Sequence, residues 1–343
     1  MIRRGVVRCA LAGVLFGVSA PAASRLAGDM SAFTLAGLLY IGASLAVLPV
    51  LNRTRPTSRA LKRGAIRLGV AVVVGGAVGP VFLAAGLSHA PAATASLLLN
   101  LELVFTAVLA SLVFREHLGR RVLTGTALVV IAGGVLGWSG SADLRFGALL
   151  IAAACLCWAV DNCVTAALDE LAPAHITFAK GIIAGGANLA IGLALSAPPT
   201  GWSVLAGLLI GGFGYGISIT LWVAGARDLG AARAQLVFAI APFVGAIIAW
   251  TAFAEPIAGR EVVSLLIAAV GVSFVLGSSH LHEHHHHVDT HDHEHSHDDG
   301  HHGHRHPDRP DGRHHHVHEH RAVSHAHPHV PDIHHRHEHS ATQ

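Results

Sequence analysis

Residues 90–121 read APAATASLLLNLELVFTAVLASLVFREHLGRR, and they contain an apolar run over residues 92–114 with a single carboxylate, Glu102, in its middle. A helix rises about 1.5 Å per residue, so this run is long enough to cross a bilayer core of about 30 Å. A shift of 139 positions gives GAARAQLVFAIAPFVGAIIAWTAFAEPIAGR, residues 230–260, where Glu255 stands for Glu116. The sequence therefore indicates a membrane-spanning unit that is written twice.

The composition agrees with a membrane protein. Of the 343 residues 52% are hydrophobic and 13% are charged, and the mean hydropathy is +0.52, which is unlike a soluble domain. The four cysteines all fall within apolar runs, so no disulfide framework is expected. A net charge of +2 gives no sign of nucleic-acid binding. The sequence contains no nucleophile–base set and no phosphate loop, so we do not expect an enzyme.

Ten apolar segments follow one another along the chain, and each is too apolar for a surface helix. They cover residues 6–24, 33–51, 68–87, 92–114, 122–138, 146–167, 176–196, 203–225, 231–253 and 262–277. Five spans per unit is an odd number, so the two units must enter the membrane in opposite senses, as in many secondary transporters. The predicted fold is an all-α membrane protein of ten transmembrane helices in two inverted five-helix repeats, residues 1–138 and 139–279, followed by a tail, residues 280–343.

The distribution of Lys and Arg predicts the orientation. With the N-terminus inside, fourteen of these residues lie on the cytoplasmic side, and three, Arg25, Arg145 and Arg260, lie outside. The positive-inside rule then places both termini in the cytoplasm. Residues 1–22 also resemble a secretory signal peptide, but residues 15–19 align with residues 157–161 of the second unit, and a discarded leader would not need a second copy.

These features resemble the EamA family of the drug/metabolite transporter superfamily. The residues that carry the resemblance are Glu116-His117-Leu118 with Gly125 and Gly133-Gly134, and Glu255-Pro256-Ile257 with Gly271. Trp158 stands where the family often has a Trp near the start of each half, whereas the first half has Phe16 there. The resemblance covers about residues 6–277. It implies a permease of the bacterial inner membrane, often an exporter of amino acids or other small metabolites.

Ionisable residues within the spans are candidates for the transport mechanism, because a charge at a helix centre costs about 2.5–3.5 kcal/mol to insert unless it is paired or hydrated. Asp161 and Lys180 lie at similar depth on consecutive antiparallel helices, so they are placed to form an ion pair. Their pairing could also be purely structural, and Lys180 could extend to the surface. Glu116 and Glu255 lie at the membrane edge, where we expect them to cap helices or to pair with arginines.

Glu102 is the sharpest candidate because it lies near mid-bilayer with no obvious cation at its depth. A carboxyl group that is protonated in place would let proton and substrate binding compete, as an antiporter requires. The alternative is a neutral Glu102 that ties helices together through an asparagine. Other polar residues are expected to line the pathway, although in membrane helices such groups often serve only local hydrogen bonds. These residues are Asn100, Asn162, Asn188, Tyr215, Trp222 and Gln235.

The tail differs in composition from the rest of the chain. It holds 26 of the 29 histidines, interleaved with Asp and Glu, and too few apolar residues to bury a core, so we expect it to be disordered without metal. Imidazole is a ligand for zinc, nickel, cobalt and copper, and the tail has no fixed four-ligand spacing, which favours buffering or sensing. The candidate ligands are His284, His285, His286, His287, His291, His293, His295, His297, His301, His302, His304, His314, His315 and His316.

Two functions therefore remain open. The first is a proton-coupled exporter of a small metabolite such as an amino acid, with a metal-binding regulatory tail. The second is a transition-metal exporter for nickel, cobalt or zinc whose cytoplasmic tail captures or senses the metal. Against the second, the spans contain no cluster of His or carboxylate residues. No cofactor is required by either function. The expected partners are the lipid bilayer, a small-molecule or ion substrate and tail-bound metal. We expect a monomer, and an oligomer stays open.

Overall fold

A computed structural model describes residues 2–51, 56, 58–114, 120–138, 141–166, 168, 171–229, 234 and 237–276, and four short stretches between 280 and 329. The contacts within the chain divide it into two compact units, a helical unit and a tail unit that begins at Ser279.

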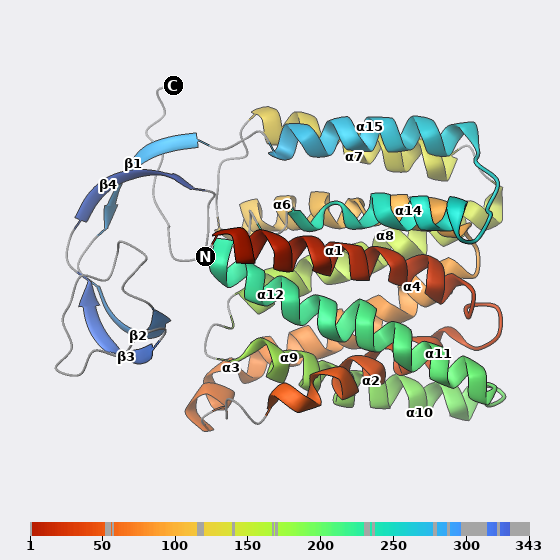
Figure 1. Cartoon of the computed structure of the whole chain (residues 1–343), viewed down its shortest axis with the longest axis horizontal. Helices are drawn as coiled ribbons and strands as arrows, with labels where there is room; N and C mark the ends of the chain where they lie inside the picture. The colour runs from red at the N-terminus through yellow and green to blue at the C-terminus, as the bar shows by residue number, and fades with distance from the viewer. Residues whose placement is uncertain are drawn as a thin grey trace. The chain divides into compact units, whose positions relative to one another are not determined.

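The helical unit is a bundle of long helices (Figure 1). In the first half these are α1 (Ile2–Ser24), α2 (Ala32–Leu51), α3 (Ser58–Val70), η1 (Ala71–Val78), α4 (Gly79–Leu87), α5 (Ala92–Leu98), α6 (Leu101–Phe114) and α7 (Arg120–Trp138). In the second half they are α8 (Ala142–Ala166), α9 (Pro173–Ala179), η2 (Lys180–Gly185), α10 (Gly186–Leu195), α11 (Gly201–Gly211), η3 (Gly212–Ile217), α12 (Ser218–Leu229), α14 (Ala241–Thr251) and α15 (Gly259–Leu276).

Eight helices in the described part of the chain are long and apolar enough to cross a membrane. They correspond to the first eight spans that the sequence predicts, and several of them join elements that follow without a break, such as α3, η1 and α4. The predicted span 231–253 is described only in part, with the eleven-residue α14 as its helix. The predicted span 262–277 lies largely within α15. The chain is thus an integral membrane protein with multiple apolar helices.

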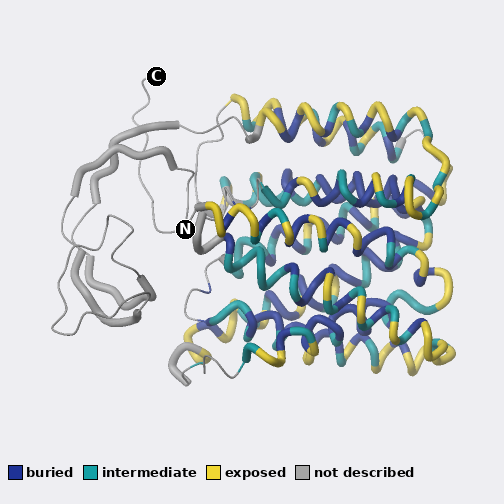
Figure 2. The backbone as a smooth tube through the Cα atoms, viewed as in Figure 1, coloured by how far each residue is buried: buried dark blue, intermediate teal, exposed yellow. Residues whose placement is uncertain are grey.

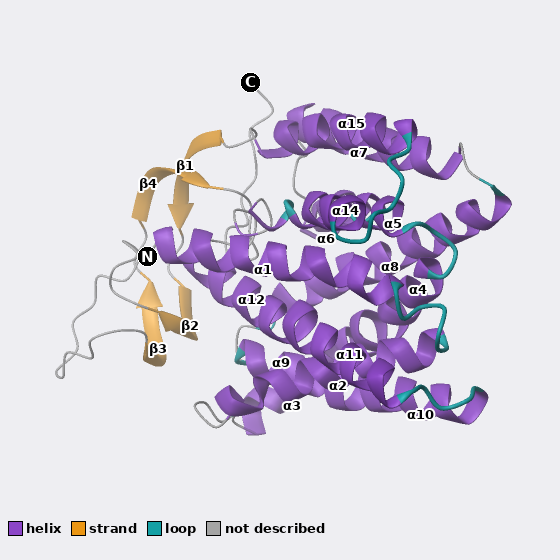
Figure 3. Ribbon diagram, turned by 45° about the vertical axis from the view of Figure 1, so that its right-hand side comes forward, coloured by secondary structure: helices purple, strands orange, loops and turns teal. Residues whose placement is uncertain are grey.

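The packing of the helices follows the sequence repeat. A shift of 139 residues carries α4 onto α12, α6 onto α14 and α7 onto α15. In the first half α1 packs on α12 and α14, and in the second half α8 packs on the corresponding helices α4 and α6. Helices α7 and α15, which correspond to each other, pack side by side (Figure 3). The same contacts therefore occur twice, as a twofold arrangement of two similar units requires.

Contacts between loops show that the related helices α1 and α8 run in opposite directions. Arg25, directly after α1, donates through Nη2 to the carbonyl oxygen of Phe253 at 2.8 Å. The same loop holds Glu255, which accepts a hydrogen bond from the first backbone N–H of α5. His89, just before α5, contacts Asp143 at the start of α8, with 2.7 Å between Nδ1 and Oδ1. Hence α8 begins at the end of the bundle where α1 ends.

Three spans contain a short π-helical segment, and glycine is frequent in each: η1, η2 and η3. Segments of this kind inside α-helices often mark functional sites. A Cβ added at Gly75 would lie 2.3 Å from Cγ of Asp161, and one at Gly214 would lie 2.3 Å from Cβ of Ser19. Gly75 and Gly214 are related by the 139-residue shift, so both repeats use the missing side chain to let a helix approach closely.

The buried core lies where the helices meet in the middle of the bundle, and the outward faces are exposed (Figure 2). The side chains on these outward faces are largely aliphatic, as expected for a surface in contact with lipid. Prolines mark two helix starts: Pro91 precedes α5, and Pro242 lies in the first turn of α14. Proline is tolerated there because the first turn of a helix has no intrahelical acceptor for its N–H.

The tail unit contains strands where the sequence analysis expected disorder. The structure describes β1 (His280–His286) paired antiparallel with β4 (Val323–His329), and β2 (Asp289–His295) paired antiparallel with β3 (His314–His320). The prediction of a fully disordered tail is therefore wrong for these four stretches. Strand pairing satisfies backbone groups without needing the apolar core whose absence suggested disorder.

The close approach at Gly75 leads to a test of stability. We expect Gly75→Ala to lower the melting temperature in detergent, because the added methyl group would overlap the Asp161 carboxylate; overpacking of this kind costs about 1–3 kcal/mol. Gly186→Ala is the matched control, since a Cβ there meets no atom within 4 Å. An equal loss of stability in both variants would contradict this explanation.

Candidate functional site

A cavity lies among the helices of both halves and encloses about 610 Å³ of empty space, part of it continuous with the outside. Its walls come from α1, α2, α6, η2 and η3, with several residues each from α8 and α12. The lining residues are Phe16, Tyr40, Glu102, Trp158, Asp161, Asn162, Thr165, Lys180, Tyr215, Ile219, Trp222, Val223 and Phe238. The cavity thus combines aromatic walls with two carboxylates and one ammonium group.

Asp161 and Lys180 form a buried ion pair in the wall of this cavity. The Lys180 ammonium group donates to Oδ2 of Asp161, and the two residues are only 7% and 4% exposed. Thr165, one turn further along α8, donates to the other Asp161 oxygen at 3.0 Å. A buried charge is stable only when it is paired and its remaining lone pairs are used, and this arrangement meets both conditions. The pairing that the sequence suggested is present.

Within the described part of the chain, Glu102 is hydrogen-bonded to a neutral side chain and not to a cation. Its Oε1 accepts a hydrogen bond of 2.8 Å from the side-chain amide of Asn162 on α8. Of the three asparagines that the sequence offered, Asn162 is the one that reaches the carboxylate. Asn100 donates to the carbonyl of Leu97 at 2.9 Å, and Asn188 donates to the carbonyl of Ala77 at 3.0 Å.

A second, smaller cavity of about 310 Å³ adjoins the first, and Glu102, Phe16 and Phe238 line both. Asn100 lines this second cavity together with residues of α14 such as Ala241 and Pro242. Glu102 therefore stands where the two cavities meet, between α8 and the start of α14.

The aromatic lining contains hydrogen-bond donors of two kinds. Tyr40 donates its hydroxyl to the carbonyl of Gly75 at 2.8 Å, and Trp158 donates its indole N–H to the same oxygen at 3.2 Å. These bonds use a carbonyl in the π-helical segment η1. The indole N–H of Trp222 is buried and has no hydrogen-bond partner among the described residues. Trp222 can therefore offer its N–H to an acceptor atom of a bound molecule.

The structure brings together Glu102, Asp161, Lys180, Asn162, Tyr215 and Trp222, places Asn100 in the adjoining cavity, and leaves Asn188 outside both. Gln235 lies outside the described residues. Sequence reasoning missed Tyr40, Thr165 and Phe238. One signal was available: the chain has only two tyrosines, Tyr40 and Tyr215, and both line this cavity.

The candidate metal ligands lie in the tail unit. Nine of them fall in described strands, whereas His287, His297, His301, His302 and His304 lie outside the described residues. Among the side chains that the structure describes, no group of three His, Cys, Asp or Glu residues is placed to hold a metal ion.

Comparison with known proteins identifies the family. A model of the EamA-like transporter family matches residues 3–137 and again residues 145–277. The chain belongs to the EamA-like transporter family. This family is part of the drug/metabolite transporter superfamily, so the resemblance seen in the sequence is confirmed, and the chain is a membrane transporter built from two EamA repeats.

Two similar proteins support this assignment. The EamA chain is 26% identical over 298 residues to an uncharacterized transporter of Methanothermobacter thermautotrophicus. The aligned region covers 79% of this chain and 85% of that relative. A crystal structure described only as that of a protein has a TM-score of 0.59 at 18% identity, covering 80% of this chain and 98% of the other. The second likeness shows the fold alone.

The buried ion pair predicts the effect of removing one charge. We expect Lys180→Met to destabilise the protein by about 3–5 kcal/mol, because it leaves the Asp161 carboxylate buried without a counter-charge. The double variant Asp161→Asn/Lys180→Met removes both charges and should recover most of this loss. Thermal unfolding in detergent measures both variants. A double variant less stable than Lys180→Met would contradict the pairing.

Proposed function

We propose that this EamA transporter is a proton-coupled exporter of a small metabolite such as an amino acid in a bacterial inner membrane. In this proposal ten helices form two inverted repeats, both termini are cytoplasmic, and one chain is the functional unit. The proposal is supported by the positive-inside charge distribution and by the opposite directions of α1 and α8.

The observation that carries the proposal is that one cavity presents a carboxylate and an ammonium group together with aromatic rings. An amino acid has the complementary groups. Its ammonium group would face Glu102, its carboxylate would face Lys180, which has further N–H donors beyond the one given to Asp161, and Trp222 would donate to a carboxylate oxygen. Aromatic rings attract cations and bury apolar side chains, which suits the remainder of such a molecule.

Glu102 is the group that we assign to proton coupling. Asp161 is already neutralised by Lys180, whereas Glu102 has an amide as its partner. Among the described residues Glu102 is therefore the cavity carboxylate that no ion pair satisfies, and it can bind either a proton or a cation. Proton and substrate ammonium would then compete for the same carboxylate. Competition of this kind exchanges one for the other across the membrane.

Replacing Glu102 tests the coupling. In Glu102→Gln the amide oxygen can still accept from Asn162, but the group can no longer bind a proton. We expect transport of radiolabelled amino acids driven by a pH gradient in proteoliposomes to be lost. Any exchange of internal for external amino acid that remains should be weakened by the loss of the carboxylate facing the ammonium group and should no longer depend on pH. Asp143→Asn removes an exposed carboxylate and is the control that should keep the pH response. Unchanged pH-driven transport in Glu102→Gln would remove Glu102 from the mechanism.

We further propose that the tail binds transition metals as a regulatory element. The composition supports this, and so does the strand register, in which His280, His282 and His284 lie directly opposite His329, His327 and His325. Alternate residues of a strand share one face, so these six positions lie on one face of the pair formed by β1 and β4. Neutral imidazoles at this spacing are suitable ligands for zinc, nickel, cobalt or copper.

Truncation after Gly277 separates the tail from transport and decides between an amino-acid exporter and a metal exporter. We expect the full-length protein to bind several equivalents of Ni²⁺ or Zn²⁺ by calorimetry and the truncated protein to bind far fewer. In a deletion strain challenged with amino acids, both forms should restore growth. Rescue of metal sensitivity by the full-length form alone, with no amino-acid phenotype, would favour the metal exporter over the function proposed here.

A further inference from the structure

The end of the bundle where α1 ends and α5 begins is held together by carboxylates from the second repeat. Glu255 accepts two hydrogen bonds of 2.9 Å, one on each oxygen, from the backbone N–H groups of Ala92 and Ala93. These N–H groups have no acceptor within their own helix because they lie in its first turn. Both oxygens of one side chain are thus committed to the other repeat, 162–163 residues away.

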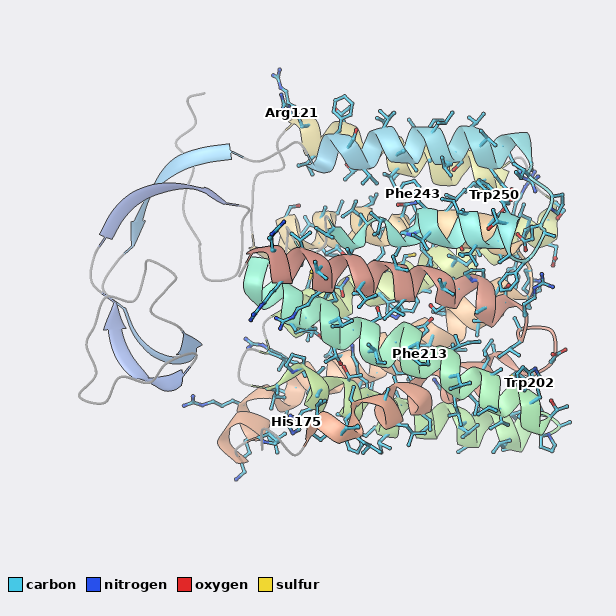
Figure 4. The ribbon with its side chains drawn as sticks, viewed as in Figure 1. Arg121, His175, Trp202, Phe213, Phe243 and Trp250 are labelled. Atoms are coloured by element: carbon cyan, nitrogen blue, oxygen red, sulfur yellow. The ribbon has the colours of Figure 1, made fainter. Side chains whose placement is uncertain are left out.

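A second carboxylate beside it makes further bonds between the repeats. Glu261, at the start of α15, is 2% exposed and accepts from the hydroxyl of Thr94 at 2.7 Å. Its other oxygen accepts from the indole N–H of Trp250, which lies on α14 (Figure 4), at 3.1 Å. We call Glu255, Glu261, Ala92, Ala93 and Thr94 the outer clasp. Arg25 adds to it, because its guanidinium group lies 4.6 Å from the ring centroid of Phe253 while bonding the carbonyl of that residue.

The helices beneath the clasp are in close contact. Helix α14 packs on α5 and α1, and a Cβ added at Gly245 would lie 2.6 Å from Oγ of Ser96 and 2.8 Å from the carbonyl of Gly17. Further along the same span, α6 packs on α8 instead, and the smaller cavity lies between the start of α6 and the start of α14. The two corresponding spans are therefore packed most closely at the clasp, and beyond it Leu103 and Val104 of α6 still pack with Ala239 in a small buried cluster.

The large cavity lies toward the opposite end of these helices. Thr165 is next to the last residue of α8, a helix that begins at the clasp end, and Trp222 and Val223 lie in the middle of α12, past the middle of the span that begins at Gly201. The positive-inside rule assigns these helix ends to the cytoplasm, because fourteen Lys and Arg residues lie on their side, and it assigns the clasp end, which has only three, to the outside. On this assignment the clasp closes the external end of the bundle.

We propose that the outer clasp is the external gate of this transporter: the Glu255 carboxylate holds the two repeats together in the inward-facing state, and its release from Ala92 and Ala93 opens the external path. This inference rests on the proposed transport function. It assigns to Glu255 and Glu261 a positioning role, because neither lines the cavity. Since closure at one end is coupled to opening at the other in a rocking mechanism, weakening the clasp must also close the cytoplasmic side.

The test follows accessibility at both ends. Glu255→Gln keeps the shape of the side chain but replaces one acceptor by an NH₂ group that faces a backbone N–H donor. Reporter cysteines are placed at Ser96→Cys, beneath the clasp, and at Ile219→Cys, in the cavity wall, each in a chain whose four native cysteines are replaced by alanine. Membrane-impermeant maleimide is added from outside to intact cells and from the cytoplasmic side to inverted vesicles.

We expect Glu255→Gln to raise external labelling at position 96 roughly tenfold, the effect of losing a charge-assisted hydrogen bond, and to lower cytoplasmic labelling at position 219. Asp143→Asn removes an exposed carboxylate at the same end, one that contacts His89, and is the control that should change neither. External labelling that rises while cytoplasmic labelling stays the same would show a helix cap without a gating role. Unchanged labelling at both positions would also overturn the proposal.

A second measurement covers the case in which the chain without its native cysteines does not fold. Hydrogen exchange of the purified protein with its native cysteines should become faster over residues 92–98 and slower over residues 216–224 in Glu255→Gln; faster exchange at 92–98 alone would overturn the gate. Neither measurement depends on the cargo or on protons. Failure of the gate therefore leaves the role of Glu102 standing, and failure of the Glu102→Gln test leaves the gate standing.

Discussion

The buried ion pair between Asp161 and Lys180 is the constraint from which the geometry of the site follows. Two charges in an apolar bundle persist only in contact with each other, so α8 and η2 must meet at these residues. Their meeting requires Gly75 in η1, because a side chain there would overlap Asp161, and a Cβ at the adjacent Gly76 would come within 3.0 Å of the Ala184 methyl group. The π-helical turn then presents the Gly75 carbonyl to Tyr40 and Trp158, which form the next part of the wall.

The two repeats share a framework but differ in chemistry at corresponding places. A shift of 140 residues carries Tyr40 to Lys180, and the alignment of the first and sixth spans carries Ser19 to Asp161. One half thus has the ion pair where the other half has Tyr40 packed against the ring of Tyr215, with 5.6 Å between the ring centroids. Glu102 has Ala241 as its counterpart. The duplicated helices form the scaffold, and the unmatched side chains give the cavity a charged side and an aromatic side.

Much of the fold and part of the site could be predicted from the sequence. The apolar runs, the 139-residue shift and the odd number of spans per unit are enough to indicate two inverted units, because bilayer thickness and backbone hydrogen bonding leave few alternatives. Asp161 and Lys180 could be paired because the sequence places them at similar depth on consecutive antiparallel helices. The sequence could not decide whether Asn100, Asn162 or Asn188 is the hydrogen-bond partner of Glu102. Residue spacing gives the depth of each side chain in the membrane, but it does not give the helix that each side chain faces. The strands of the tail were missed because composition indicates the lack of a core but not backbone pairing.

Glu255 shows the limit most clearly. Its position at a helix end and its recurrence after 139 residues suggested a helix cap, but the sequence pointed to the neighbouring helix or to arginines, whereas the carboxylate binds a helix of the other repeat. By itself the sequence determined that apolar helices cross a membrane, that the unit is repeated, and which charged groups must be buried, because these depend on hydropathy and spacing along one chain. Only the tertiary structure decided which helices touch, that the aromatic and charged residues share one cavity, and that Glu255 and Glu261 join the two repeats at one end. Those features depend on how helix faces pack against each other, which residue spacing along the chain does not specify.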